Sequence, residues 1–185
     1  MEGLEHFQQK WDRFCDRKCA GTTLEAGVAQ AAAPWDGGAV HATENEAAMR
    51  YWLMKSEPDT FSWDDLVKKG EAEWDGVRNH TAQLNMKAME VGDQALFYHS
   101  NIGLECVGIM KIVRTAEQDS TDETGKWKAV MVAPYKKLAK PVTLKAIKAD
   151  PALEKMELIR QSRLSVAPVR DEEFARILEM AGGTE

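Results

Sequence analysis

Hydrophobic and polar positions after Arg50 follow strand-like and helix-like patterns in turn. Short apolar or alternating runs bounded by turn residues are typical of β-strands. They predict strands at Tyr51–Lys55, Gln94–His99, Glu105–Thr115, Trp127–Ala133 and Leu164–Val169, with Val142 and Leu144 entering one more. Pro168 has no N–H to give to a neighbouring strand, so the run that contains it is expected at an edge of the sheet.

Helix signals lie between these runs. Ser62 followed by Asp65 predicts a capped helix start, and Gly70 predicts its end. Further helices are expected at Asn79–Met89, after Pro151 and at Asp171–Met180. Five or six strands with small helices around them predict an α+β fold, a small mixed or antiparallel β-barrel with short flanking helices.

The first 48 residues follow a different pattern. Leu4, Phe7, Trp11 and Phe14 recur at helical spacing within residues 3–18, and an Ala-, Gly-, Thr- and Glu-rich stretch without a period follows. We therefore divide the chain into a flexible extension, residues 1–48, and a domain, residues 49–185. The short helix is either a docking site for a protein partner over residues 1–18 or only marginally stable. A further interpretation is that the native protein begins at Met49.

The charge balance limits how this chain can meet nucleic acid. It has 24 basic and 30 acidic residues in 185, a net charge of −6. A protein that coats DNA or RNA by charge alone should be basic, because phosphate contacts need Lys and Arg. Any nucleic acid must therefore be recognised through a local pocket or a small basic face.

The sequence points to a cytoplasmic protein. Its apolar runs, such as Ala129–Pro134, are far shorter than the roughly 20 residues that span a bilayer, and the charged first twenty residues do not resemble a signal peptide. We expect free thiols at Cys15, Cys19 and Cys106. Two thiols at i, i+4 with His6 nearby are too few ligands to predict a metal site.

The familiar catalytic patterns are missing from the sequence. It has no G-x-S-x-G, P-loop, G-x-G-x-x-G or H-E-x-x-H motif. His80 and His99 are the only histidines of the predicted domain, and Cys106 lies within a strand, where it is expected to pack as a small hydrophobe. We therefore expect neither catalysis nor a cofactor.

Polar residues next to aromatic ones mark the ends of the predicted elements, where a rigid scaffold presents binding groups. This combination suits a flat ligand with a polar edge, such as a nucleobase held by stacking and edge hydrogen bonds. A carboxylate of Glu57 or Asp75 repels phosphate but accepts a hydrogen bond from an exocyclic amine. The candidate pocket residues are Lys55, Ser56, Glu57, Trp74, Asp75, Arg78, Asn79, Tyr98, His99, Ser100, Asn101, Arg163 and Ser165.

Each of these assignments has a structural alternative. Trp74, expected in a loop, is either a ligand-facing ring or a core residue. Arg78 and Arg163 either line the pocket or form salt bridges with Glu57 or Asp75. The lysines between residues 136 and 148 form a solvated face or guide phosphate.

Five blocks of sequence resemble the EVE domain family, in family order, from Tyr51 to about Met180. They are Tyr51–Pro58, Trp74–Asn79, Gly92-Asp93 with Phe97–Asn101, Pro141–Leu144 and Arg163–Val166. The resemblance implies a PUA-like fold, related to the YTH domains that hold methylated adenine in RNA. It implies a non-catalytic reader of one flipped, modified base, with 5-methylcytosine-type pyrimidines in DNA, or RNA, as the expected ligands.

The resemblance also implies individual roles. Trp74 becomes the stacking face, whereas Lys55, Ser56 and Glu57 reach the base edge. Arg78, Asn79, Ser100 and Arg163 line or brace the pocket by the same resemblance. His80 departs from the family pattern, where an aromatic residue such as Tyr or Phe is more frequent.

Two other functions compete with a base reader. One is a hydrolase on a PUA-like scaffold that acts on a modified nucleoside, with Lys55, Glu57 and His99 as acid–base groups. The other is an adaptor that works through residues 1–18.

Overall fold

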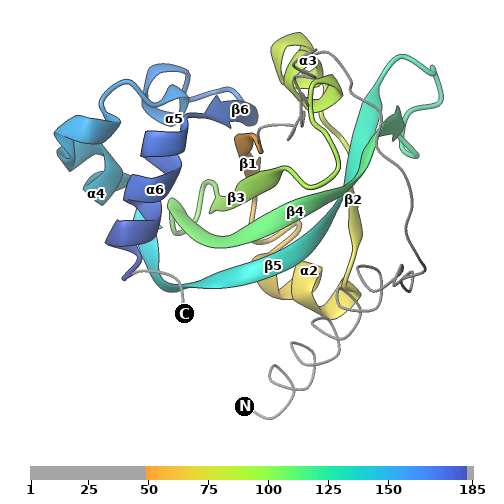
Figure 1. Cartoon of the computed structure of the whole chain (residues 1–185). Helices are drawn as coiled ribbons and strands as arrows, with labels where there is room; N and C mark the ends of the chain where they lie inside the picture. The colour runs from red at the N-terminus through yellow and green to blue at the C-terminus, as the bar shows by residue number, and fades with distance from the viewer. Residues whose placement is uncertain (1–48, 183–185) are drawn as a thin grey trace, which may run out of the picture. The chain divides into compact units, whose positions relative to one another are not determined.

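Six strands in one mixed sheet organise the part of the chain that the computed structural model describes, residues 49–182 (Figure 1). The strand order is β2-β5-β4-β3-β1-β6; β1 and β3 run parallel, and the other neighbours are antiparallel. The strands are β1 Tyr51–Ser56, β2 Ala72–Trp74, β3 Gln94–His99, β4 Glu105–Gln118, β5 Lys128–Thr143 and β6 Val166–Val169.

Five α-helices and one 3₁₀ turn accompany the sheet in this region. They are α2 Trp63–Lys69, α3 His80–Lys87, α4 Leu144–Ala149, the 3₁₀ turn η1 Pro151–Leu153, α5 Glu157–Arg160 and α6 Asp171–Met180. The predicted capping box is present, because Ser62 and Asp65 exchange side-chain and backbone hydrogen bonds. Asn79 caps α3 by accepting the Ala82 N–H.

The sheet is buried on both faces. Along β1, Trp52 and Met54 enter one core cluster and Leu53 enters the other, as the two-residue period of a strand requires. The first cluster takes side chains from α2 and α3, and the second from α4, η1, α5 and α6. In Figure 1, α4, α5 and α6 gather at one end of the view, away from α2 and α3.

The turn before β3 is fixed by a buried carboxylate. Asp93 accepts hydrogen bonds from the Trp52 indole N–H at 2.9 Å and from the backbone N–H groups of Arg50 and Glu90. A buried carboxylate is stable only when its oxygens are paired in this way. The interaction aligns the start of β1 with the turn before its parallel neighbour β3.

Several predicted boundaries are confirmed and others need correction. Gln94–His99 and Asp171–Met180 have the predicted bounds, and the strand with Pro168 is an edge strand. The predicted Trp127–Ala133 strand instead continues to Thr143, because a bulge at Tyr135 accommodates the neighbouring Pro134. Leu144 starts a helix rather than a strand, and the three-residue strand β2 was not predicted.

The α+β class with mixed strand directions is confirmed, but the sheet of residues 49–182 is not closed. β2 and β6 lie at opposite ends of the strand order. No helix in this region is long and apolar enough to cross a membrane. The helix expected within residues 3–18 and the linker after it lie outside the described residues, so the division at residue 48 stays a prediction.

Trp63 packs directly over the backbone of β4 at Gly108. A Cβ placed at position 108 would lie 2.4 Å from the Trp63 ring, well inside van der Waals contact. Trp63 is buried in the first core cluster and anchors the start of α2. Glycine is therefore needed at this position to let helix and sheet approach.

We predict that Gly108→Ala lowers the free energy of unfolding by about 1–3 kcal/mol, the usual cost of overpacking a core. The exposed Thr115→Ala, on the same strand, is the control and should change it by less than about 1 kcal/mol. Urea denaturation of both variants measures the effect. Equal stabilities for wild type and Gly108→Ala would contradict the close approach.

Candidate functional site

A cavity of about 600 Å³ opens where the end of β1, α2, β2 and the loop before α3 meet. Its volume lies within the range of about 300–1,000 Å³ that is usual for small-molecule sites. The cavity is lined by Lys55, Ser56, Thr60, Phe61, Lys69, Glu73, Trp74, Asp75, Gly76, Val77, Arg78, Asn79 and Ser165.

The cavity brings together more than half of the residues that the sequence nominated. Those that line it are Lys55, Ser56, Trp74, Asp75, Arg78, Asn79 and Ser165. Arg163 lies in an adjoining hollow. Glu57 and Asn101 are exposed and do not line the cavity.

Tyr98, His99 and Ser100 serve other purposes at the end of β3. Tyr98 is 2% exposed and belongs to the core cluster on the other face of the sheet, because successive strand residues point to opposite faces. Burial, and secondly the charge of Cys106, raise the pKa of Tyr98 to about 12. His99 Nε2 accepts a hydrogen bond from the backbone N–H of Trp63, and burial lowers the pKa of His99. Ser100 donates to the Ser56 carbonyl from both its N–H and its hydroxyl. These last two residues brace the elements around the cavity rather than lining it.

Trp74 is both a core residue and part of the cavity wall. It ends β2, so its expected place in a loop was wrong, and only 6% of its surface is exposed. Its ring packs edge-on against Phe97 at 5.4 Å between centroids and against Phe61 at 6.2 Å. Edge-to-face packing at these distances is favourable and fixes the orientation of the indole.

The end of β1 holds two loops beside the cavity. The Lys55 ammonium donates to the Ser162 carbonyl at 2.8 Å, and the Lys55 N–H donates to the Ser165 carbonyl at 2.9 Å. Ser56 donates its hydroxyl to the Phe61 carbonyl at 2.6 Å. Burial lowers the pKa of Lys55. These contacts fix the two loops that supply Phe61 and Ser165 to the lining.

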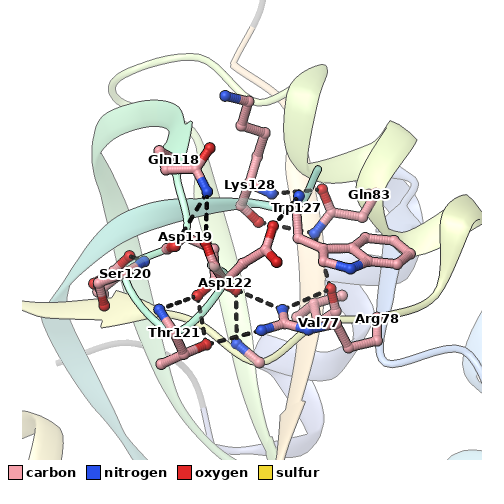
Figure 2. A network of polar contacts seen from close by, with 12 residues as sticks. Val77, Arg78, Gln83, Gln118, Asp119, Ser120, Thr121, Asp122, Trp127 and Lys128 are labelled. Atoms are coloured by element: carbon pink, nitrogen blue, oxygen red, sulfur yellow. Dashed lines mark hydrogen bonds and ion pairs between the residues drawn. The ribbon is translucent and has the colours of Figure 1, made fainter. Parts of the chain in front are cut away.

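A buried carboxylate holds the cavity-lining segment between β2 and α3 (Figure 2). The Asp119 side chain is fully buried and accepts from the Arg78 guanidinium at 2.6 Å and from the Gly76 N–H at 3.0 Å. Arg78 also donates to the Thr121 hydroxyl at 2.9 Å. The expected partners of Arg78, Glu57 and Asp75, are therefore replaced by Asp119. This pairing orients Arg78 and fixes Gly76, which has a φ of 71°.

The loop after β4 is tied together by short-range turns. Asp119 accepts from the N–H and hydroxyl of Thr121 (Figure 2). Asp122 accepts in the same way from Thr124. Side-chain bonds of Asp to residues two positions on are typical turn formers. The repeated Asp-x-Thr spacing was a readable turn signal, but nothing in it indicated Arg78 as a partner.

Gln83, a residue of α3, links the end of this loop to the wall of the cavity. Its amide nitrogen donates to the carbonyls of Val77 and Lys128, and its oxygen accepts the Lys128 N–H (Figure 2). The Gln83 side chain is buried, and its bond to Val77 forms away from water, whereas the two bonds to Lys128 are partly buried. Gln83 thus connects the start of β5 to the segment that lines the cavity.

Charges of both signs line the cavity. The pKa of Asp75 is raised, first by partial burial and then by repulsion from Asp119 and Glu73. Lys69 and Arg78 oppose the shift, and the Lys69 ammonium lies 5.1 Å from the Phe61 ring centroid. Aromatic side chains that share a lining with hydrogen-bond donors and acceptors can hold a flat heterocycle with a polar edge.

The residues considered for catalysis do not gather in the cavity. Within residues 49–182 no group of His, Cys, Asp and Glu could hold a metal ion. Cys106 is buried, and burial, then Glu105, raises its pKa to about 12, which disfavours a thiolate. Of the proposed acid–base groups Lys55, Glu57 and His99, only Lys55 lines the cavity.

Comparison with known proteins identifies the family. The EVE domain model matches residues 50–180, so the chain belongs to the EVE domain family, as the five sequence blocks predicted. Thymocyte nuclear protein 1 of Mus musculus is 35% identical over 164 residues, covering 70% of this chain and 73% of that protein.

Solved structures of the family share the fold. Rpa0253 from Rhodopseudomonas palustris is 51% identical with a TM-score of 0.69, covering 72% of this chain and 94% of that one. The human THYN1 protein, crystallised with DNA containing 5-methylcytosine, is 31% identical with a TM-score of 0.67, covering 74% and 99%. An ASCH protein from Zymomonas mobilis, 13% identical with a TM-score of 0.50, covers 73% and 98% and shares the fold alone. The PUA-like α+β fold is thereby confirmed.

We predict that Asp119→Asn lowers the free energy of unfolding by about 1–3 kcal/mol at pH 7. The amide nitrogen of the new side chain is itself a donor, and it would face donors that need an acceptor. Burial alone would raise the pKa of Asp119, but bonds from Thr121, Arg78 and Gly76 outweigh it and lower the pKa. A carboxyl with a lowered folded pKa stabilises above its unfolded pKa of about 3.9, and this contribution is lost as the pH falls through the folded value.

Urea denaturation of wild type and Asp119→Asn at several pH values tests this. The two stabilities should converge below the ordinary carboxyl pKa of about 3.9. The exposed Asp59→Asn, whose side chain has no partner in the described region, is the control and should match wild type at pH 7. A constant difference at every pH would contradict the charged role of Asp119.

Proposed function

We propose that this chain reads a modified nucleobase: it binds one flipped pyrimidine of the 5-methylcytosine type, in DNA or RNA, within the cavity and without catalysing a reaction. The observation that carries the proposal is the cavity itself, with Trp74 in its wall and a mixed polar lining. The human relative crystallised with 5-methylcytosine DNA supports the choice of ligand.

The lining matches the chemistry of a cytosine. Trp74 and Phe61 supply apolar walls for the ring and its methyl group. The exocyclic amine of cytosine is a hydrogen-bond donor, and the Asp75 carboxylate can accept its hydrogen bond. Lys55, Arg78 and Asn79 bring donors to the same lining, which suit the acceptor atoms of the pyrimidine edge.

The charge of the protein favours a single extruded base over a bound duplex surface. The net charge is −6, and Glu73 and Asp75 lie in the cavity lining, where they disfavour phosphate. Flipping a base costs a few kcal/mol, and stacking on an aromatic side chain returns about 1–3 kcal/mol. Hydrogen bonds to the base edge must supply the remainder, so affinity depends on the polar lining.

The bracing around the cavity serves this role. Arg78 is held by Asp119, and Phe61 is held by the Ser56 hydroxyl, so the walls are ordered before a ligand arrives. Preordered walls reduce the entropy lost on binding. The competing hydrolase has less support, because Glu57 and His99 do not line the cavity with Lys55.

Two further expectations stay predictions. The protein partner proposed for residues 1–18 concerns residues outside the described region. The cytoplasmic location is tested neither by the fold nor by the family.

Titration with two single-stranded oligonucleotides tests the proposal, one with a single 5-methylcytosine and one with cytosine. We expect saturable, tighter binding of the methylated strand, with the nucleosides unchanged after incubation. Trp74→Phe should weaken that binding at least about threefold, because a smaller ring stacks less well. Phenylalanine is chosen because the buried Trp74 would leave a destabilising cavity if it became alanine.

Trp63→Phe is the matched control. Trp63 packs edge-on against the same Phe97 and is equally buried, but it does not line the cavity. Its variant should bind as wild type does. Equal binding of the two oligonucleotides would refute methyl recognition, and conversion of the methylated nucleoside would favour an enzyme.

A further inference from the structure

A second hollow, of about 360 Å³, adjoins the cavity in which we place the base (the base cavity). It lies between the start of α3 and the segment that joins α5 to β6. Asn79 lines both, so the two hollows are neighbours on the same face. The second is lined by Asn79, Thr81, Arg160, Gln161, Ser162, Arg163 and Leu164.

The two hollows differ in charge. The base cavity combines the carboxylates Glu73 and Asp75 with the cations Lys55, Lys69 and Arg78, whereas the second hollow is lined by two arginines and no acidic residue. The Glu157 carboxylate, outside the lining, pairs with Arg160 at 3.6 Å and accepts from the Gln161 amide. An anion therefore meets only basic charge in the lining of the second hollow, whereas in the first it meets carboxylates as well as cations.

Arg163 differs from the other arginines of residues 49–182. Each of the others forms an ion pair: Arg50, Arg78, Arg114, Arg160, Arg170 and Arg176. Arg163 is exposed and has no hydrogen bond or ion pair in this region. Its guanidinium, which can bind phosphate oxygens in a bidentate fashion, is thus available to a ligand.

The backbone around Arg163 is fixed beside the base cavity. Lys55, which lines that cavity, donates its ammonium to the Ser162 carbonyl and its N–H to the Ser165 carbonyl. Leu164 is buried in the first core cluster. Arg163 therefore lies between the anchored residues Ser162, which lines the second hollow, and Ser165, which lines the first.

We propose that the second hollow is a phosphate subsite, in which Arg163, with Arg160 beside it, binds a backbone phosphate next to the base held in the first cavity. This inference rests on the proposed function and deepens it. It separates the two tasks: the cavity with charges of both signs reads the base, and the basic hollow holds the phosphate. An acidic protein thereby gains a local contact for the nucleic-acid backbone.

Arg163→Gln tests the subsite, with Lys148→Gln as the matched loss of one positive charge. Lys148 is exposed, lies on α4 and belongs to the lysine run that was the other candidate for guiding phosphate. The probes are the methylated and unmethylated oligonucleotides, and free 5-methyldeoxycytidine, which has no phosphate. Inorganic phosphate is a competitor that distinguishes a general anion site from a backbone site.

We expect Arg163→Gln to weaken oligonucleotide binding about three- to tenfold and to reduce the slope of log affinity against log salt by about one. The preference for the methylated strand and the affinity for the nucleoside should stay as in wild type, and Lys148→Gln should bind as wild type. Competition by millimolar phosphate that Arg163→Gln abolishes would support the anion site itself.

The failures of the two proposals are distinguishable. Unchanged oligonucleotide affinity and salt slope in Arg163→Gln, with methyl preference intact in wild type, would overturn the subsite and leave the base reader. A reduced slope in a protein that shows no methyl preference would support the subsite and refute the reader. An equal loss in Lys148→Gln would overturn the subsite, because the effect would then be one of general charge.

Discussion

The buried carboxylate of Asp119 is the interaction on which the candidate site depends. It accepts from the Gly76 N–H, the Arg78 guanidinium and both donors of Thr121, so it joins two segments more than forty residues apart. A fully buried carboxylate is tolerated only with such pairing. The loop between β2 and α3, which supplies much of the cavity lining, is therefore tied to a loop that contributes nothing to the lining itself.

The aromatic cluster around Phe97 imposes a second constraint. Phe61, Trp63 and Trp74 all pack against this one ring, from different elements. Two of the three, Phe61 and Trp74, also line the cavity. The packing that stabilises the sheet thus also sets the spacing of the cavity walls. A substitution of Phe61 or Trp74 in the cavity wall therefore changes the stability of the core as well.

The sequence predicted the local parts of this structure well. The Ser62–Asp65 capping box and the helix at Asp171–Met180 depend on contacts between near neighbours, which patterns reveal. The short strand β2 was missed, because three residues give no period to detect. Asp119 was missed as well, because its partner Arg78 lies 41 residues away and only the fold brings them together.

The nominated site residues show the same division. Lys55, Trp74 and Arg78 line one cavity, and their roles toward a base stay predictions. Tyr98 points to the opposite face of the sheet, because successive strand residues alternate between the two faces. The sequence contained this alternation, but Tyr98 was nominated only for its position at a strand end. Arg163, nominated for the base pocket, lies in the neighbouring hollow.

The most direct test of the account is a crystal structure of this chain with an oligonucleotide that contains one 5-methylcytosine. The account predicts the methylated base inside the cavity, against Trp74, with its exocyclic amine within hydrogen-bonding distance of Asp75. A methylated base left stacked in the strand, with the nucleic acid bound on another face, would contradict it.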